Sequence, residues 1–101
     1  MSKKIEHSVN KFAGMVLRRL MMRLGDKGDA WGDVHPLWVI AKLTEELGEV
    51  ASGVNHSFDG TGRLTPGREQ HLIEAISECY DVGAMAMILA ETLSDALAGD
   101  Q

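Results

Sequence analysis

Two short acidic segments carry the residues of this chain whose types and spacing could do chemistry. The first contains Glu45, Glu46 and Glu49, and the second contains Glu78 and Asp81. Glu46 and Glu49 are three residues apart, as are Glu78 and Asp81, and this spacing places both carboxylates of a pair on one face of an α-helix. Like charges at this spacing repel each other and weaken a helix, so their occurrence in two segments indicates that the negative charge serves a function. The pattern predicts a site for hard cations, because Mg²⁺ binds carboxylate oxygens and shares its remaining positions with water and phosphate.

The donor types narrow the choice of metal. A di-iron carboxylate bundle needs Glu-x-x-His on two helices, and neither acidic segment has a histidine at the fourth position. The four histidines are scattered without the spacing of metal ligands, which favours surface or capping roles for them. Oxygen ligands alone favour Mg²⁺, or else Mn²⁺, over iron and zinc. The predicted metal ligands are therefore Glu46, Glu49, Glu78 and Asp81.

The composition is that of one small domain spanning residues 1–101. Hydrophobic residues make up 45% of the chain and aromatic residues only 5%, which favours helix-on-helix packing over a β-sandwich. The net charge is −5 and there is no basic tract, so nucleic acid polymers and anionic membranes are not expected as main partners. The single Cys79 allows no intrachain disulfide and the first ten residues do not form a signal peptide, so a cytoplasmic location is expected.

Three helices are expected to position the acids. Apolar residues recur at three- and four-residue steps over 8–24, and a Gly- and Asp-rich loop is expected at 25–35. Pro36 is expected to begin the second helix. The apolar stripe predicted for that helix consists of Ile40, Leu43, Leu47, Val50 and Val54.

An irregular segment is expected at 55–67, before the third helix. Thr65 is expected to cap this helix and Pro66 to be its first residue. The helix is expected to run to about residue 98, with a break or bend near Gly83.

The third helix is apolar over a wide arc. The residues of this arc are Val82, Met85, Ile88, Leu89 and Leu93. Glu78 and Asp81 continue the stripe of Met85 and Ile88, and acids so close to a core are costly unless they are paired or bind metal. Three helices with broad apolar stripes form an incomplete bundle. The predicted fold is therefore all-α, a four-helix-type core completed by a homodimer or a higher even oligomer.

The ordered pair of acidic segments resembles a known family. The segments are HPLWVIAKLTEELGEVASGV and EAISECYDVGAMAMILAETL. They are similar to the MazG-like, all-α nucleoside triphosphate pyrophosphohydrolases, whose hallmark is Glu-Glu-x-x-Glu on one helix and Glu-x-x-Asp on the next. The resemblance covers roughly residues 35 to 95 and maps the hallmark onto Glu45, Glu46, Glu49, Glu78 and Asp81. This sequence departs from the family in its long, Gly-rich connection at 50–77.

The resemblance implies a Mg²⁺-dependent enzyme that hydrolyses a nucleoside or deoxynucleoside triphosphate to the monophosphate and pyrophosphate. The predicted ligands would hold two or more ions, and a bound water would attack the α-phosphorus. Glu45 would orient or deprotonate this water, or would simply lie on the surface. The alternative is a non-catalytic helical dimer that acts as a binding or regulatory module, with the acids as a structural or vestigial metal site.

Further residues are candidates for substrate contact. Trp31 and Trp38 could stack on a base, or could anchor a loop and pack in the core, respectively. Lys42 could contact phosphate or balance Glu46 at i,i+4. Arg63 and Arg68 could clamp a triphosphate as the segment around them closes, or could be solvated loop charges.

Overall fold

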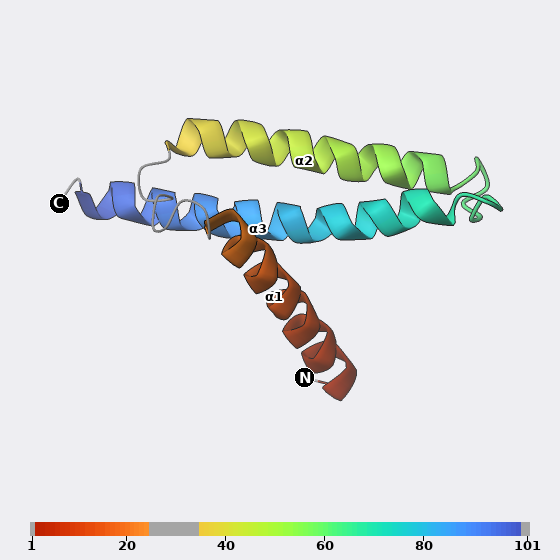
Figure 1. Cartoon of the computed structure of the whole chain (residues 1–101), viewed down its shortest axis with the longest axis horizontal. Helices are drawn as coiled ribbons and strands as arrows, with labels where there is room; N and C mark the ends of the chain where they lie inside the picture. Colours follow the sequence, from red (N-terminus) through yellow and green to blue (C-terminus); the bar gives the residue numbers. More distant parts are fainter. Residues whose placement is uncertain (1, 25–34, 100–101) are drawn as a thin grey trace.

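The fold consists of three α-helices, which the computed structural model describes over residues 2–24 and 35–99; the predicted loop at 25–34, including Trp31, lies outside them. The helices are α1 (Lys3–Leu24), α2 (Pro36–Ser57) and α3 (Glu69–Gly99), and the described residues form no β-sheet. Helices α2 and α3 lie side by side as a long antiparallel pair, and α1 crosses α3 at a steep angle (Figure 1). The prediction of an all-α fold is confirmed.

None of the described helices combines the length and the apolar character that a membrane crossing requires.

The first two helices begin where side chains cap their backbone. Helix α1 begins five residues earlier than predicted, because Ser2 Oγ accepts a hydrogen bond from the backbone N–H of Ile5 at 3.2 Å. Helix α2 begins at Pro36 as predicted, and His35 Nδ1 accepts from the N–H of Leu37 at 3.1 Å. A capping role, one of the two expected for the histidines, is therefore confirmed for His35.

The connection between α2 and α3 is shorter and more ordered than predicted. Helix α2 extends to residue 57, and Phe58 pairs with Leu64 in an antiparallel bridge. Between them Asp59 Oδ1 accepts hydrogen bonds from the backbone N–H groups of Thr61 at 2.8 Å and Arg63 at 3.1 Å. Hydrogen bonding, first from the Thr61 side chain, lowers the pKa of Asp59. The aspartate therefore fixes a tight turn where an irregular segment was expected.

The predicted start of α3 at Thr65 and Pro66 is wrong. The N–H of Arg68 donates to the carbonyl of Thr65 at 3.2 Å, and Gly67 between them has a φ of +80°. Proline in the second position and glycine with positive φ in the third are the features of a type II turn. Pro66 therefore belongs to this turn, and the helix begins after it, at Glu69.

Of the break or bend predicted near Gly83, the break is wrong, because α3 is continuous from Glu69 to Gly99, while the bend stays a prediction. Gly83 lies where α1 crosses. A Cβ atom at this position would lie 2.8 Å from Val16 Cγ2 and 2.9 Å from Phe12 Cζ, closer than carbon atoms pack. The glycine therefore permits the close approach of α1 without ending the helix.

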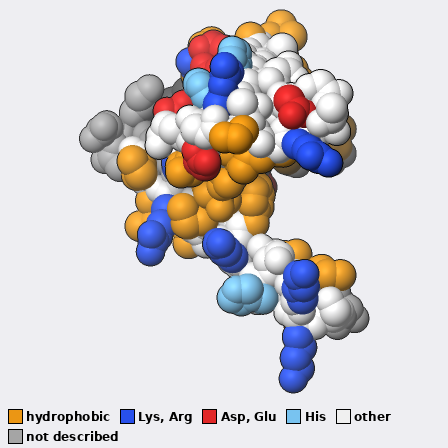
Figure 2. All heavy atoms as spheres, turned by 90° about the vertical axis from the view of Figure 1, so that its right-hand side faces the viewer, with side chains coloured by type: hydrophobic (Ala, Val, Ile, Leu, Met, Phe, Trp, Pro, Cys, Tyr) orange, Lys and Arg blue, Asp and Glu red, His pale blue; other side chains and the backbone are white. Residues whose placement is uncertain are grey.

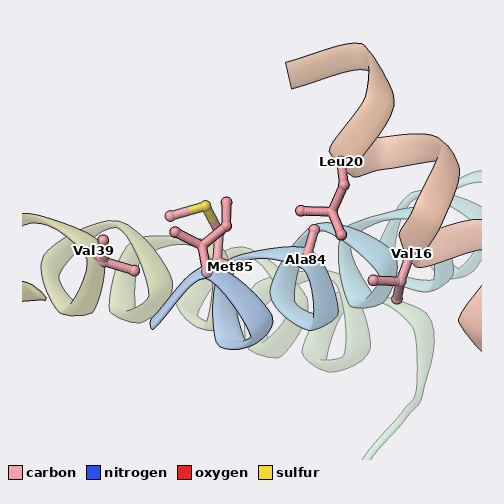
Figure 3. Close-up of a cluster of buried hydrophobic side chains, with 6 residues drawn as sticks. Val16, Leu20, Val39, Ala84 and Met85 are labelled. Carbon is pink, nitrogen blue, oxygen red and sulfur yellow. The ribbon is translucent and has the colours of Figure 1, made fainter. Parts of the chain in front are cut away.

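The core forms around this crossing. Its buried residues are Val16, Leu20, Val39, Ala84, Met85 and Ile88. Figure 3 shows Leu20 of α1 above Ala84 of α3 and Val16 of α1 to the right of Ala84, with Met85 turned toward Val39 of α2. Two of the five apolar residues predicted on the arc of α3, Met85 and Ile88, are thus covered within one chain.

The apolar stripe predicted for α2 is only partly correct. Val39, which was not predicted, is fully buried, while Leu43 and Val50 are half-buried. Ile40, Leu47 and Val54 are 46%, 56% and 40% exposed. The face of α2 toward α3 is therefore offset by about one residue from the predicted stripe, and a second apolar stripe remains at the surface.

The molecule is elongated for its size. Its radius of gyration is 16.3 Å, whereas a compact chain of this length has roughly 13 Å. The N-terminal half of α1 stands away from the α2–α3 pair (Figure 1), and its Ile5 and Val9 are 54% and 56% exposed. Hydrophobic side chains gather at the surface between the pair and this arm (Figure 2). A single copy thus leaves a large apolar area in contact with water.

Candidate metal centre

Three of the five predicted acids converge where α2 and α3 face one another. One carboxylate oxygen of Glu46, one of Glu49 and one of Glu78 all lie within 4.8 Å of each other. Glu46 and Glu78 are half-buried on the facing sides of the two helices, and Glu49 is exposed at the edge. This carboxylate cluster joins residues 32 positions apart, and it could hold a metal ion.

The electrostatics of the cluster centre on Glu78. Its Oε2 atom is buried and receives no hydrogen bond from any of the described residues. Hydrogen bonding to the Glu46 carboxyl, burial, and the bonding and charge of Glu49 together raise the pKa of Glu78 to about 7. The three groups therefore resist being ionised together, and a proton or a cation must compensate them.

A divalent cation fits this arrangement. The donor set is entirely carboxylate oxygen, which suits Mg²⁺ and Mn²⁺. A cation among the three groups would give Glu78 Oε2 a partner that the described residues do not supply, and it would favour the ionised form of Glu78.

Asp81 lies one turn beyond Glu78 on α3, outside this group of three. Arg19 Nη1 of α1 donates to both of its carboxylate oxygens at 3.2 Å, and Arg19 Nη2 donates to Ser77 Oγ at 2.7 Å. The assignment of Asp81 as a metal ligand stays a prediction. Arg19 was not predicted as a site residue, although its position three residues after Val16, within the apolar stripe of α1, is a signal that it has a buried partner.

Glu45 and Lys42 pair with each other at the surface. Lys42 Nζ lies 3.8 Å from Glu45 Oε2, across an i,i+3 step. Lys42 therefore balances Glu45 in this structure, where the alternatives were Glu46 or phosphate. The role of Glu45 in activating water stays a prediction.

The other candidates for substrate contact are exposed. Trp38 is 52% exposed in the first turn of α2, so it does not pack in the core of one chain. Arg63 lies in the turn after α2, and Arg68 Nη1 donates to the carbonyl of His56 at 3.4 Å. Both arginines lie near the turn, as predicted, and their contact with substrate stays a prediction.

An open cleft of about 330 Å³ extends from the cluster between α2 and α3 toward the turn. Glu49 and Glu78 line the end at the cluster. Ser52, Gly53, His56, His71, Glu74 and Ala75 line the remainder. A Cβ atom at Gly53 would lie 2.9 Å from Ala75 Cβ, so this glycine sets how closely the helices approach at the floor of the cleft.

Comparison of this chain with protein-family models, curated proteins and solved structures finds no match. The structure itself establishes a small three-helix α protein with an acidic cluster that could hold a metal ion.

The stability of the metal-free protein is expected to fall as the pH rises toward 7. The folded-state pKa of Glu78 is about 7 against an ordinary value of 4.5, so between these values the folded protein binds more protons than the unfolded chain. Stability from this group is present below about pH 4.5 and lost above about pH 7. Mg²⁺ should restore it at neutral pH, by about 2.7 kcal/mol at a concentration of about 100 Kd.

Thermal unfolding between pH 5 and 8, with and without Mg²⁺, measures both effects. Glu78→Gln should flatten the pH dependence and blunt the response to Mg²⁺. Glu91→Gln, which removes an exposed acid elsewhere on α3, should change neither. A wild-type melting temperature that Mg²⁺ leaves unmoved would count against a site at these residues.

Proposed function

We propose that this chain is a Mg²⁺-dependent nucleoside triphosphate pyrophosphohydrolase of the MazG-like type. One observation carries the proposal: Glu46, Glu49 and Glu78, which the resemblance assigns to one metal site, converge from two helices to within 4.8 Å. A second observation in support is that the buried Oε2 of Glu78 has no hydrogen-bond partner among the described residues.

The chain's own residues would supply the binding site and its geometry. Bound Mg²⁺, or Mn²⁺, would neutralise phosphate charge and lower the pKa of a coordinated water. Glu46 and Glu49 would fix the site from α2, and Glu78 would join from α3 after losing its proton. Because two packed helices hold the carboxylates, little rearrangement would be needed, and catalysis would rest on positioning and charge stabilisation.

In the proposed reaction the oxygen of water bonds to the α-phosphorus. The bond between the α-phosphorus and the oxygen that bridges it to the β-phosphorus breaks. Pyrophosphate is the leaving group, and the nucleoside monophosphate is the other product. Glu45 could accept the proton of the water if its side chain turns from Lys42 toward the cluster. Asp81 could complete the ligand set if its ion pair with Arg19 opens.

We further propose that the protein acts as a homodimer, or a higher even oligomer. The exposed arm of α1, with Ile5 and Val9, and the exposed stripe of α2 offer apolar surfaces that a second copy would cover. Leu93, predicted on the apolar arc of α3, is also 51% exposed. The radius of gyration of 16.3 Å, against roughly 13 Å for a compact chain of this length, supports this proposal.

The alternative is a non-catalytic helical module with a structural or vestigial metal site. One observation favours it: the carboxylate of Asp81 is already engaged by Arg19, so a fourth ligand is not ready in this conformation. In this case Mg²⁺ would stabilise the protein without conferring turnover.

Incubation with Mg²⁺ and a panel of ribo- and deoxyribonucleoside triphosphates, followed by identification of the products, tests the proposal. We expect monophosphate and pyrophosphate in equal amounts. Orthophosphate as the product would indicate another class of hydrolase. No turnover of any nucleotide, with stabilisation by Mg²⁺ retained, would favour the non-catalytic module.

A further inference from the structure

An ion pair joins α1 to α3 at residues that flank Glu78 of the carboxylate cluster. Arg19 Nη1 donates to both carboxylate oxygens of Asp81 at 3.2 Å, and Arg19 Nη2 donates to Ser77 Oγ at 2.7 Å. Ser77 immediately precedes Glu78 on α3, and Asp81 follows Glu78 by three residues. The guanidinium of Arg19 is therefore anchored at two points on α3, one before and one after a residue of the cluster.

The ion pair is partly shielded from water. The side chains of Arg19 and Asp81 are 26% and 15% exposed. Removal of one partner from a shielded pair leaves the other charge uncompensated, so Arg19 is expected to stabilise the metal-free protein. The two acids of the second acidic segment thus differ. Asp81 has a cation of the chain beside it, whereas Oε2 of Glu78 receives no hydrogen bond from any described residue.

A divalent cation at the cluster would compete with Arg19 for Asp81. The guanidinium and the metal ion carry like charges and repel each other, most strongly where the protein excludes water. A carboxylate that already compensates an arginine is also a weaker ligand, because metal affinity rises with the negative charge of the ligand set. For Asp81 to join the cluster its ion pair must open, and this cost is subtracted from the free energy of metal binding.

We propose that Arg19 is a positioning residue that holds Asp81 away from the metal site until a divalent cation takes this carboxylate from it. The proposal rests on the proposed metal site, with Asp81 as a fourth ligand, and it is independent of turnover. In the metal-free protein Arg19 ties α1 to α3 through Asp81 and Ser77. In the metal-bound protein Asp81 serves the cluster, and Arg19 gives up both contacts and turns to solvent. The affinity for metal is thereby lower than four unopposed carboxylates would give.

Calorimetric titration of the full chain with Mg²⁺ tests the role of Arg19. Arg19→Gln should bind Mg²⁺ about tenfold more tightly than wild type and have a lower metal-free melting temperature, because the ion pair no longer forms. Arg18→Gln is the matched control. It removes the same charge from the adjacent, exposed position, so its affinity should stay within about twofold of wild type. Ser77→Ala removes one anchor of Arg19 and keeps both charges of the pair, so it should tighten binding by about threefold.

Asp81→Asn shows whether Arg19 acts through Asp81. This variant should bind Mg²⁺ more weakly than wild type. Adding Arg19→Gln to it should change the affinity no more than Arg18→Gln does, because no carboxylate is left to compete for. The proposal is overturned if folded Arg19→Gln, or Ser77→Ala where Arg19→Gln does not fold, binds Mg²⁺ no more tightly than wild type. It is also overturned if the gain in affinity persists with Asp81→Asn. When wild type binds Mg²⁺, these results refute only the role of Arg19, whereas a wild type and an Arg19→Gln variant that both bind no Mg²⁺ refute the metal site as well.

Discussion

Glu49→Gln is expected to lower the turnover of nucleoside triphosphate by about a hundredfold or more, while the helical fold stays intact. Glu49 is exposed, so the isosteric amide removes a charge without disturbing the core. The lost group is one of three carboxylates within 4.8 Å, and an amide cannot replace its charge on a divalent ion. Pyrophosphate release at saturating Mg²⁺ gives kcat, and far-UV circular dichroism reports the fold.

Asp81→Asn should also abolish turnover if Asp81 is a metal ligand. A loss of activity in this variant must be distinguished from a loss of stability, so the melting temperature is measured as well. The substitution removes the charge that pairs with Arg19, so it is expected to lower the melting temperature as well. Arg19→Lys keeps a positive charge beside Asp81 and shows the effect of altering the pair alone. Near wild-type activity of Glu49→Gln or Asp81→Asn at saturating Mg²⁺ would show that the ligand assignment is wrong.

The convergence of Glu46, Glu49 and Glu78 could be predicted because it depends on helical periodicity. Once each acid is placed on a helix beside an apolar stripe, packing of the two stripes brings the carboxylates to one place. The start of α2 at Pro36 was predictable for a similar reason, since proline at this position needs no hydrogen-bond partner.

The errors arise where a local signal has two structural outcomes. Pro66 can begin a helix or occupy the second position of a type II turn. The positive φ of Gly67 shows that the turn is formed, and this conformation is known only from the structure. Gly83 can end a helix or allow a neighbouring helix to approach closely, and the outcome depends on the path of α1, which periodicity does not give. The contacts of Arg19 with Asp81 and of His56 with His71 also join different helices, so they depend on how the helices pack and could not be predicted from helical periodicity.

Ile88→Asp is expected to unfold the protein, since Ile88 is only 7% exposed and lies in the core cluster. The variant loses buried apolar surface and places a charged carboxylate in the apolar core between α1, α2 and α3. We expect a loss of about 4 kcal/mol or more, a large part of the roughly 5–15 kcal/mol that stabilises a domain. Circular dichroism should show lost helicity, and activity should be lost with it.

Val9→Asp is the matching variant for assembly. Val9 is 56% exposed on the arm of α1, so within one chain a charge here costs little, whereas at an apolar interface it is costly. We expect a folded chain of 11.0 kDa in sedimentation equilibrium, against at least twice that mass for wild type and for the Lys4→Asp control. A wild type that sediments as a monomer at micromolar concentration would contradict the proposed oligomer. The apolar arm of α1 would then need another partner, because no second helix of the chain packs along it in the described structure.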